Sequence, residues 1–471
     1  MCYASDMKVL LAASEVAPVI KLGGLGDVVG SLPKALEKIG IDVDVIVPFY
    51  PNARLASLNI YKSLEFNVGF AGDTYKIEAF KTKLPNSYVD LILLKCPEFF
   101  NMGGGSAFLN TAQETKIFTF FDRAVVGYVT SGFNSYDVVH CNDWHTGLVT
   151  HLLEEEIGNE RPATIMTIHN ISYQGVGETT LLKDLGIAPG EHRAIDWDIQ
   201  DNNLNLLLQG IISSDFVSTV SPSYAKEIMY ADIGGPLSEI VSSRKDRLVG
   251  ILNGIDYSQF PRSYDASNWK IKKPIFKTEL QKKLKLKSDD KPLFAFISRL
   301  DANQKGIDIL YDSVGEIIKK DGQFVLLGTG DKEWEGKLLS LNSVYKGNVS
   351  VNIGFDTKLA EEIYSGSDFF LVPSRFEPCG LTQMIAMWYG SVPIVHATGG
   401  LRDSVSEGKN GFLFNIYSSE YLLKAITSAL RLYKSSQFDT IVHSALEADF
   451  GWKSSALEYK GLYERAISAR I

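Results

Sequence analysis

The sequence predicts an α/β protein built from two doubly wound, Rossmann-like domains that face a central cleft. Short apolar runs alternate with segments of helical periodicity along almost the whole chain, as in parallel sheets covered by helices on both faces. With 471 residues, the chain is too long for a single hydrophobic core. Its polar and glycine-rich motifs directly follow predicted strands, where open α/β sheets bind their ligands.

The first domain is expected over residues 1–254. A strand at 8–12, a helix with one apolar face and a strand at 42–47 form a βαβ unit. Further apolar runs predict four more strands, at 137–141, 164–168, 216–220 and 248–252.

The second domain is expected over residues 255–448. Residues 256–290 are rich in Lys and Asp with weak periodicity, and the beginning of this stretch is interpreted as an interdomain linker. A second alternating series follows, with strands predicted at 293–297, 324–327, 349–353, 369–372 and 393–395. Residues 449–471 are assigned to a C-terminal helix.

Composition narrows the class of protein. A hydrophobic content of 45% is typical of a globular protein, and a net charge of -9 argues against nucleic acid as the main partner. Four cysteines without CxxC spacing indicate a reducing cytosol. No signal peptide and no apolar run of membrane-spanning length is found in the sequence, so a cytoplasmic protein with no membrane partner is expected.

The segment 373–383 combines an acid with a potential anion site. Glu377 follows a buried strand, and Gly380 allows the backbone N–H groups of Leu381 and Thr382 to approach an anion closely. An ordinary strand–turn–helix joint would explain the glycine but not an acid beside an anion-seeking helix start. The segment therefore predicts a phosphate site with a carboxylate next to it.

Two cations belong to the loop after the predicted strand 293–297. Arg299 leaves that strand, and Lys305 lies at the start of the next helix. Both would point toward the cleft from one loop, which suits a diphosphate leaving group. A solvated surface loop is the alternative.

A glycine-rich loop follows the first strand. Gly23 and Gly24 permit close approach to a ligand, Lys21 can meet a phosphate, and Asp27 can accept sugar hydroxyls. The G-x-G-x-x-G spacing is absent, which argues against a dinucleotide enzyme. A tight turn with Asp27 in the first helical turn is the alternative.

Polar residues also end three other strands of the first half. Within 140–145, Asp143 and Trp144 suit sugar recognition, although a Trp that packs a strand–helix joint is nearly as well supported. A metal site is disfavoured because residues that alternate along a strand end do not converge on one ion. His169 is expected to face a ligand, and Asn253 lies either at the site or in a simple turn.

Together, these motifs closely resemble the glycogen and starch synthase family. Six segments carry the resemblance: 21–25, 140–145, 169–175, 253–256, 298–306 and 373–383. The resemblance implies a two-domain GT-B fold whose last helix crosses back onto the first domain. It implies a retaining hexosyltransferase of glycogen or starch biosynthesis that moves glucose from a nucleotide-glucose, with ADP-glucose expected and UDP-glucose left open, to the non-reducing end of an α-1,4-glucan.

The resemblance also assigns residues by position. The catalytic group comprises Glu377, Arg299, Lys305 and His169. The donor-binding group comprises Lys21, Gly23, Gly24, Asp27, Asn253, Cys379, Gly380, Leu381 and Thr382. The acceptor-binding group comprises Asp143 and Trp144. No residue is a convincing covalent nucleophile, which favours same-face attack with the departing phosphate as base, and no metal or cofactor is expected.

The sequence departs from the family pattern at three places. The loop from Arg299 to Lys305 is one residue longer than the common bacterial form, Ile385 replaces an acid often used for the ribose, and 206–210 lacks a Lys before its Gly. A different retaining GT-B transferase, or a silent binding protein on the same fold, is the rival reading; the latter should have lost Glu377, Lys305 or Arg299. The donor base, the oligomeric state, regulation and the need for a primer stay open.

Overall fold

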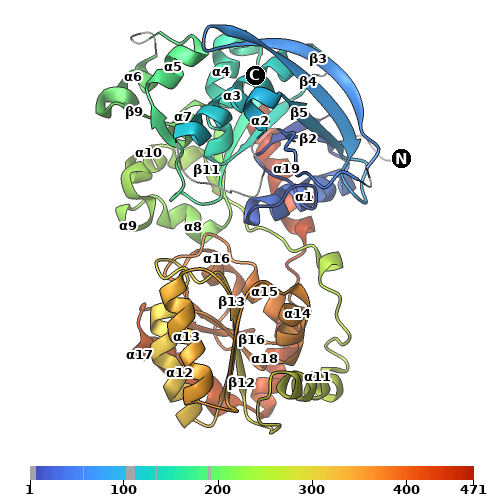
Figure 1. Ribbon diagram of the computed structural model, residues 1–471, viewed down its shortest axis with the longest axis vertical. Helices are drawn as coiled ribbons and strands as arrows, with labels where there is room; N and C mark the ends of the chain where they lie inside the picture. Colours follow the sequence, from blue (N-terminus) through green and yellow to red (C-terminus); the bar gives the residue numbers. More distant parts are fainter. Residues whose placement is uncertain are drawn as a thin grey trace. The chain divides into compact units, whose positions relative to one another are not determined.

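The computed structural model describes residues 7–56, 58–101, 112–132, 135–188, 190 and 192–470, so Cys2 lies outside the described residues. The chain divides into two compact units (Figure 1). The first unit comprises Met1–Val220, Ala225–Gly254 and Trp452–Ile471, and the second comprises Ser221–Tyr224 and Ile255–Gly451. The chain thus re-enters the first unit at Trp452. The sequence predicted that this C-terminal segment begins at residue 449.

The first unit contains a nine-stranded sheet in the order β11-β10-β7-β6-β1-β2-β5-β4-β3. Its strands are β1 (Lys8–Ala12), β2 (Asp42–Pro48), β3 (Tyr61–Phe70), β4 (Asp73–Lys83), β5 (Asp90–Lys95), β6 (Val138–Asn142), β7 (Ala163–Ile168), β10 (Phe216–Thr219) and β11 (Leu248–Gly250). The pairs from β11 to β5 are parallel, whereas β4 runs antiparallel to both of its neighbours. A short antiparallel pair, β8 (Val176–Glu178) and β9 (Asn203–Asn205), lies outside this sheet.

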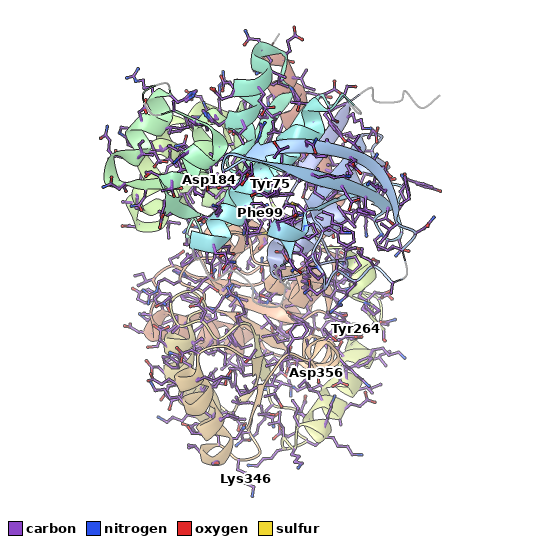
Figure 2. The ribbon with its side chains drawn as sticks, turned by 45° about the horizontal axis from the view of Figure 1, so that its top comes forward. Tyr75, Phe99, Asp184, Tyr264, Lys346 and Asp356 are labelled. Carbon is purple, nitrogen blue, oxygen red and sulfur yellow. The ribbon has the colours of Figure 1, made fainter. Side chains whose placement is uncertain are left out.

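The antiparallel edge was not predicted from the sequence. β3 is largely exposed or half-buried, so it lacks the continuous apolar run on which strands were predicted. β5 was not predicted either, although its apolar residues are buried. Tyr75 of β4 and Phe99 pack with Phe120 of α3 (Ala112–Thr130), and Tyr75 and Phe99 are labelled in Figure 2. The rings of Phe99 and Phe120 stack with their centroids 3.7 Å apart. Tertiary packing on α3 therefore stabilises strands with a weak sequence signal.

Helices and short 3-10 turns complete the first unit. They are α1 (Gly24–Lys38), α2 (Pro97–Phe100), α3, η1 (Trp144–Thr146), α4 (Val149–Ile157), η2 (Gly158–Glu160), α5 (Thr180–Leu185), α6 (Arg193–Asp198), η3 (Ile199–Asp201), α7 (Leu206–Ser213), α9 (Ala231–Gly234), η4 (Gly235–Leu237), α10 (Ser238–Ser243) and η5 (Lys245–Arg247). The helix α8 (Pro222–Glu227) is divided between the units, because its residues up to Tyr224 belong to the second. None of the helices described in either unit is long and apolar enough to cross a membrane.

The C-terminal helix α19 (Trp452–Ser468) belongs to the first unit and packs against α1 and β7. Its buried residues Tyr459 and Tyr463 belong to a hydrophobic core that they share with residues of α1, β1 and β2. Figure 1 shows α19 behind α1. The Tyr463 hydroxyl lies 2.9 Å from Nδ1 of His140, which ties the last helix to β6.

The second unit contains a six-stranded, fully parallel sheet in the order β14-β13-β12-β15-β16-β17. Its strands are β12 (Leu293–Ile297), β13 (Gln323–Gly328), β14 (Val349–Ile353), β15 (Phe369–Val372), β16 (Val392–His396) and β17 (Phe412–Phe414). Its helices are η6 (Tyr257–Gln259), α11 (Trp269–Lys283), α12 (Ile307–Lys319), α13 (Lys332–Val344), α14 (Thr357–Gly366), α15 (Thr382–Trp388), α16 (Gly399–Ser404), α17 (Ser419–Leu432) and α18 (Ser436–Glu447).

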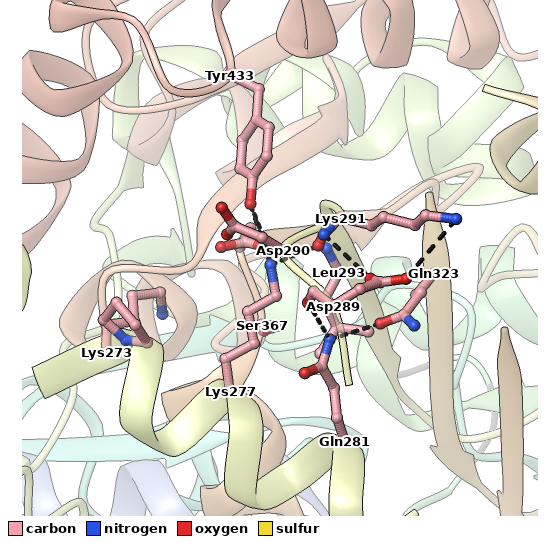
Figure 3. Close-up of polar contacts among 12 residues, drawn as sticks. Lys273, Lys277, Gln281, Asp289, Asp290, Lys291, Leu293, Gln323, Ser367 and Tyr433 are labelled. Atoms are coloured by element: carbon pink, nitrogen blue, oxygen red, sulfur yellow. Dashed lines mark hydrogen bonds and ion pairs between the residues drawn. The ribbon is translucent and has the colours of Figure 1, made fainter. Parts of the chain in front are cut away.

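A buried polar cluster fixes the amino ends of β12 and β15. Oδ2 of Asp368 accepts the backbone N–H of Leu293 at 2.8 Å and lies 2.7 Å from Nζ of Lys277. Figure 3 shows this cluster, in which Nε2 of Gln281 donates to Oε1 of Gln323 at 2.8 Å. Because parallel neighbours end at the same edge, the cluster also sets where the carboxyl ends of β12 and β15 lie.

Candidate functional site

The second unit has a pocket at the carboxyl ends of β12 and β15. Its lining residues are Phe296, Ile297, Ser298, Lys305, Leu371, Val372, Ser374, Glu377, Gly380, Leu381 and Thr382. The structure therefore brings together the predicted residues Glu377, Lys305, Gly380, Leu381 and Thr382. This edge of a doubly wound sheet is the usual position of a ligand site.

Lys305 and Glu377 form an ion pair in this pocket. Nζ of Lys305 lies 2.7 Å from Oε2 of Glu377, and the two side chains are only 16% and 10% exposed. The hydroxyl of Ser374 donates to the same oxygen at 2.9 Å. The carboxylate is thus held from two sides, and an anionic ligand entering the pocket would compete with it for the ammonium group.

Glycine at position 306 allows the Lys305 loop to reach the pocket. Gly306 has a φ of +69°, and a Cβ there would lie 2.0 Å from the carbonyl oxygen of Pro373. The backbone N–H of Arg375 donates to the carbonyl of Gln304 at 2.8 Å, which joins the same two segments. Contact between the 304–306 turn and the 373–375 turn places Lys305 beside Glu377.

Arg299 lies apart from this ion pair. Its side chain is exposed, and Nη2 donates to Oε1 of Gln304 in a long contact of 3.4 Å. Arg299 is not among the residues that line the pocket. The structure thus brings Lys305 into the pocket and leaves Arg299 on the loop beside it.

The helix start behind Glu377 is shaped by Gly380, which has a φ of +72°. Leu381 caps α15, and the helix begins at Thr382. Cys379, which the sequence assigned to the donor-binding group, is 6% exposed and is not among the residues that line the pocket, so that assignment stays a prediction. Ile385 is buried within α15 at 7% exposure and offers no polar group for a ribose.

In the first unit, a buried carboxylate that the sequence reasoning missed holds the glycine-rich loop. Glu15 is 1% exposed and accepts the backbone N–H of Leu22 and, at 2.9 Å, that of Gly23. Burial raises the pKa of Glu15, and these N–H groups oppose the shift. An acid shortly after the first strand, inside a mostly apolar stretch, was the available signal.

The two charged residues of this loop pair with each other. Nζ of Lys21 lies 2.7 Å from Oδ1 of Asp27, and the two side chains are 51% and 25% exposed. Gly23 is extended, with a φ of -146°, and Gly24 is the first residue of α1. A Cβ at Gly24 would meet nothing within 4 Å, which leaves open space beside the helix start.

Asp143 occupies a strained and buried position at the end of β6. Its φ is +58°, unusual for a residue with a side chain, and its Oδ1 accepts the backbone N–H of His169 at 2.7 Å. Burial raises the pKa of Asp143 to about 7, although the N–H groups of His169 and Asn170 lower it. Such strain often accompanies a functional position, and here it fixes Asp143 against the end of β7.

Trp144 has a different environment from the one expected of a sugar contact. The side chain is 3% exposed, and its ring stacks on His145 with centroids 4.0 Å apart. Gly175 passes so close that a Cβ there would lie 2.2 Å from Cε3 of the ring. Its ring therefore packs the strand–helix joint, which is the alternative that the sequence left open, and the acceptor contact of Trp144 stays a prediction.

His169 is held in one tautomer at the end of β7. Its Nε2 lies 2.9 Å from Oδ1 of Asn142, whose amide nitrogen donates to the carbonyl of Ala12 at 3.1 Å. The oxygen of Asn142 can only accept, so Nε2 of His169 carries the proton and Nδ1 is the acceptor of the ring. Burial lowers the pKa of His169 to about 3, so the ring is neutral at pH 7.

Asn253 lies at the end of the first unit before the chain enters the second. It is 6% exposed, and its Oδ1 is buried without a hydrogen-bond partner among the described residues. Gly254 packs on Trp452 of α19, where a Cβ would lie 2.7 Å from the backbone. An unpaired buried acceptor costs stability, which favours a ligand role over a simple turn.

Comparison with known proteins agrees with this architecture. Residues 8–243 match the family model described as starch synthase catalytic domain, and residues 277–438 match glycosyl transferases group 1. The catalytic domain of starch synthase IV from Arabidopsis thaliana, solved bound to ADP and acarbose, superposes with a TM-score of 0.86 at 31% identity and covers 98% of this chain and 99% of its own. Sucrose-phosphate synthase from Thermosynechococcus elongatus shares the fold at 20% identity, with a TM-score of 0.64 and coverage of 98% and 100%.

Two Rossmann-like units with these matches define a glycosyltransferase of the GT-B class. Glycogen synthase from Fervidobacterium nodosum is 38% identical over 98% of this chain and 99% of its own length. Glycogen synthase 2 from Geobacter sulfurreducens is 37% identical over 98% and 100%. The chain belongs to the glycogen and starch synthase family.

Proposed function

We propose that this enzyme transfers glucose, with retention of configuration, from ADP-glucose to the non-reducing end of an α-1,4-glucan. The observation that carries the proposal is the Lys305–Glu377 pair in a pocket at the carboxyl ends of β12 and β15. A cation and a carboxylate held side by side match a reaction in which a phosphate leaves as positive charge develops on a sugar. The ADP held by the Arabidopsis starch synthase IV structure supports adenine as the donor base.

In this proposal the donor diphosphate replaces Glu377 as the ion-pair partner of Lys305. The phosphate oxygens compete with Oε2 of Glu377 for the ammonium group, and the N–H groups at the start of α15 provide further donors. Glu377, still held by the Ser374 hydroxyl, then faces the sugar. Arg299, on the same loop, needs a change of side-chain rotamer to reach the phosphates, and its exposure permits one.

The first unit supplies groups that recognise neutral hydroxyls. His169 is neutral, and its Nδ1 is an acceptor because Asn142 fixes the proton on Nε2. Asn253 has a buried acceptor without a partner among the described residues. We assign His169 and Asn253 to the transferred glucose and Asp143 to the acceptor glucan. Lys21, Gly23, Gly24 and Asp27 stay assigned to the donor.

No metal ion has a role in this mechanism. Lys21, Arg299 and Lys305 carry the positive charge assigned to the leaving diphosphate. With no residue placed as a covalent nucleophile, the departing phosphate takes the proton of the attacking hydroxyl on the same face of the sugar.

The test is a product assay with ADP-glucose or UDP-glucose, each with and without added glycogen. We expect nucleotide release that depends on glycogen, a higher kcat/KM with ADP-glucose, and longer chains by chain-length analysis. A new α-linkage in the proton NMR spectrum of the product would establish retention. Formation of a disaccharide, or donor binding without turnover, would contradict the proposal in favour of another GT-B transferase or a binding protein.

A further inference from the structure

The cluster of His151, Glu155 and His192 lies in the first unit among residues that have no part in the proposed reaction. Each offers one ligand atom, and these atoms all lie within 4.8 Å of one another. His151 and Glu155 are separated by one turn of α4, so their side chains share one face of that helix. His192 comes from another element, the N-terminal cap of α6.

The contacts within the cluster leave one ligand atom unused. Nδ1 of His192 lies 3.1 Å from Oε1 of Glu155. His151 is 8% exposed, and its Nε2 is buried without a hydrogen-bond partner among the described residues. The imidazole rings of His151 and His192 meet at right angles, with centroids 5.1 Å apart. A buried imidazole nitrogen that makes no hydrogen bond costs free energy, which a ligand would recover.

We propose that His151, Glu155 and His192 bind a Zn²⁺ ion that ties α4 to α6. Two imidazoles and a carboxylate form a donor set typical of this metal, with a water molecule as the fourth ligand. The His192–Glu155 separation already matches neighbouring ligands on one ion. Glu155 is exposed and can rotate toward His151, while the backbone carbonyl of His192 is fixed because it accepts the N–H of Asp196 at 2.8 Å.

The chain offers a matched control on a helix of the second unit. His443 and Glu447 of α18 form the same kind of i,i+4 pair, with Nδ1 3.3 Å from a carboxylate oxygen, and both are exposed. Among the described residues, no third His, Cys, Asp or Glu lies close enough to this pair to complete a metal site. A histidine and a carboxylate alone are expected to bind Zn²⁺ only weakly.

The experiment is calorimetric titration of Zn²⁺ into the full chain after EDTA treatment and dialysis, with melting temperatures measured in parallel. We expect one tight site per chain and a higher melting temperature with Zn²⁺, because an ion that binds the folded state stabilises it. His192→Ala and Glu155→Gln, at positions that are not deeply buried, should each weaken binding at least ~10-fold. His443→Ala should leave the affinity unchanged.

Two results would overturn the site. One is the absence of a stoichiometric binding event in the wild-type chain. The other is a Zn²⁺ affinity that stays the same in His192→Ala and Glu155→Gln, or that falls in the control His443→Ala as much as in these two variants. Substitution by Co²⁺ gives a second readout, since its visible absorption reports tetrahedral coordination and should be lost in both cluster variants. Neither readout depends on transferase activity, so the test is independent of the proposed function.

Discussion

Glu377 is the residue on which the proposed chemistry depends most. The carboxylate is 10% exposed and is held by Lys305 and Ser374, so its negative charge is fixed in position before any substrate binds. A preorganised charge is most effective where charge develops only as a bond breaks. Its position was predicted from the sequence, whereas its partners came from the structure.

Glu377→Gln is expected to lower kcat about 10²-fold, or about 3 kcal/mol, because the amide keeps the shape and removes the charge. Steady-state kinetics with saturating donor and glycogen measure the loss, and circular dichroism checks the fold. The exposed Glu420→Gln on α17 is the control. A folded Glu377→Gln variant with near-normal turnover would exclude this role.

Lys305→Ala is expected to reduce kcat by a similar factor of about 10², since it removes the cation assigned to the leaving phosphate. It also leaves Glu377 without its ion-pair partner. Kinetics with varied ADP-glucose and varied glycogen separate the two substrates, and Lys332→Ala, at an 83% exposed side chain, is the control. A change confined to the KM for glycogen would show that the diphosphate assignment is wrong.

At the scale of elements, turns with close backbone contacts decide where the charged residues lie. Gly306 brings the turn before α12 against Pro373, and Glu15 fixes the loop before α1. The Gly306–Pro373 contact does not follow from local propensity, because it joins segments far apart in the sequence.

Gly306→Ala tests the first of these contacts. Its Cβ would lie 2.0 Å from a backbone carbonyl, at a φ of +69°. Gly408→Ala is the matched control, because Gly408 has a φ of +67° and nothing within 4 Å of the added Cβ. We expect the control to cost about 1 kcal/mol of unfolding free energy and Gly306→Ala about 2 kcal/mol more. Urea denaturation measures both, and equal costs would show that the close contact is unimportant.

The helix α19 provides a pH-dependent contact through His140. The His140 ring is hydrogen-bonded to the Thr167 hydroxyl at 2.6 Å and to the Tyr463 hydroxyl. Burial lowers the pKa of His140 to about 3, and His169 adds a smaller effect. The unfolded chain takes up this proton near pH 6.5, whereas the folded chain does not until about pH 3. The contribution of neutral His140 is therefore complete above pH 6.5 and falls as the pH decreases toward 3.

His140→Gln should therefore remove part of this acid sensitivity. Between pH 7 and pH 5 the wild-type chain is expected to lose about 2 kcal/mol of unfolding free energy relative to the variant. Denaturant titrations at several pH values measure the difference. A difference that does not change with pH would mean that His140 is protonated equally in both states.

At the scale of the whole molecule, the proposed mechanism assigns the charges of the reaction to side chains and not to a metal ion. Activity is accordingly expected to survive EDTA with less than about a 2-fold change in kcat, since Lys305 and the start of α15 meet the phosphate charge. Assays at 25 °C after EDTA dialysis measure this. Loss of activity that Mg²⁺ restores would contradict the mechanism. Removal of the Zn²⁺ ion proposed to bind His151, Glu155 and His192 should instead lower the melting temperature.

The sequence alone determined the α/β class and most of the parallel strands, because buried strands leave continuous apolar runs, and it predicted the site positions from the polar residues that follow those runs. It did not predict the parallel strands β5 and β17. It also did not predict β3 or β4, whose alternating, half-exposed residues become strands by packing on α3. The tertiary structure also decided between alternatives that the sequence left open. Trp144 is packed by Gly175, Lys305 reaches Glu377 through Gly306, and Glu15 holds the glycine loop. The contacts of Trp144 and Lys305 join distant segments, which local patterns do not encode. The Glu15 contact is local in sequence, but it depends on burial of the carboxylate in the folded unit.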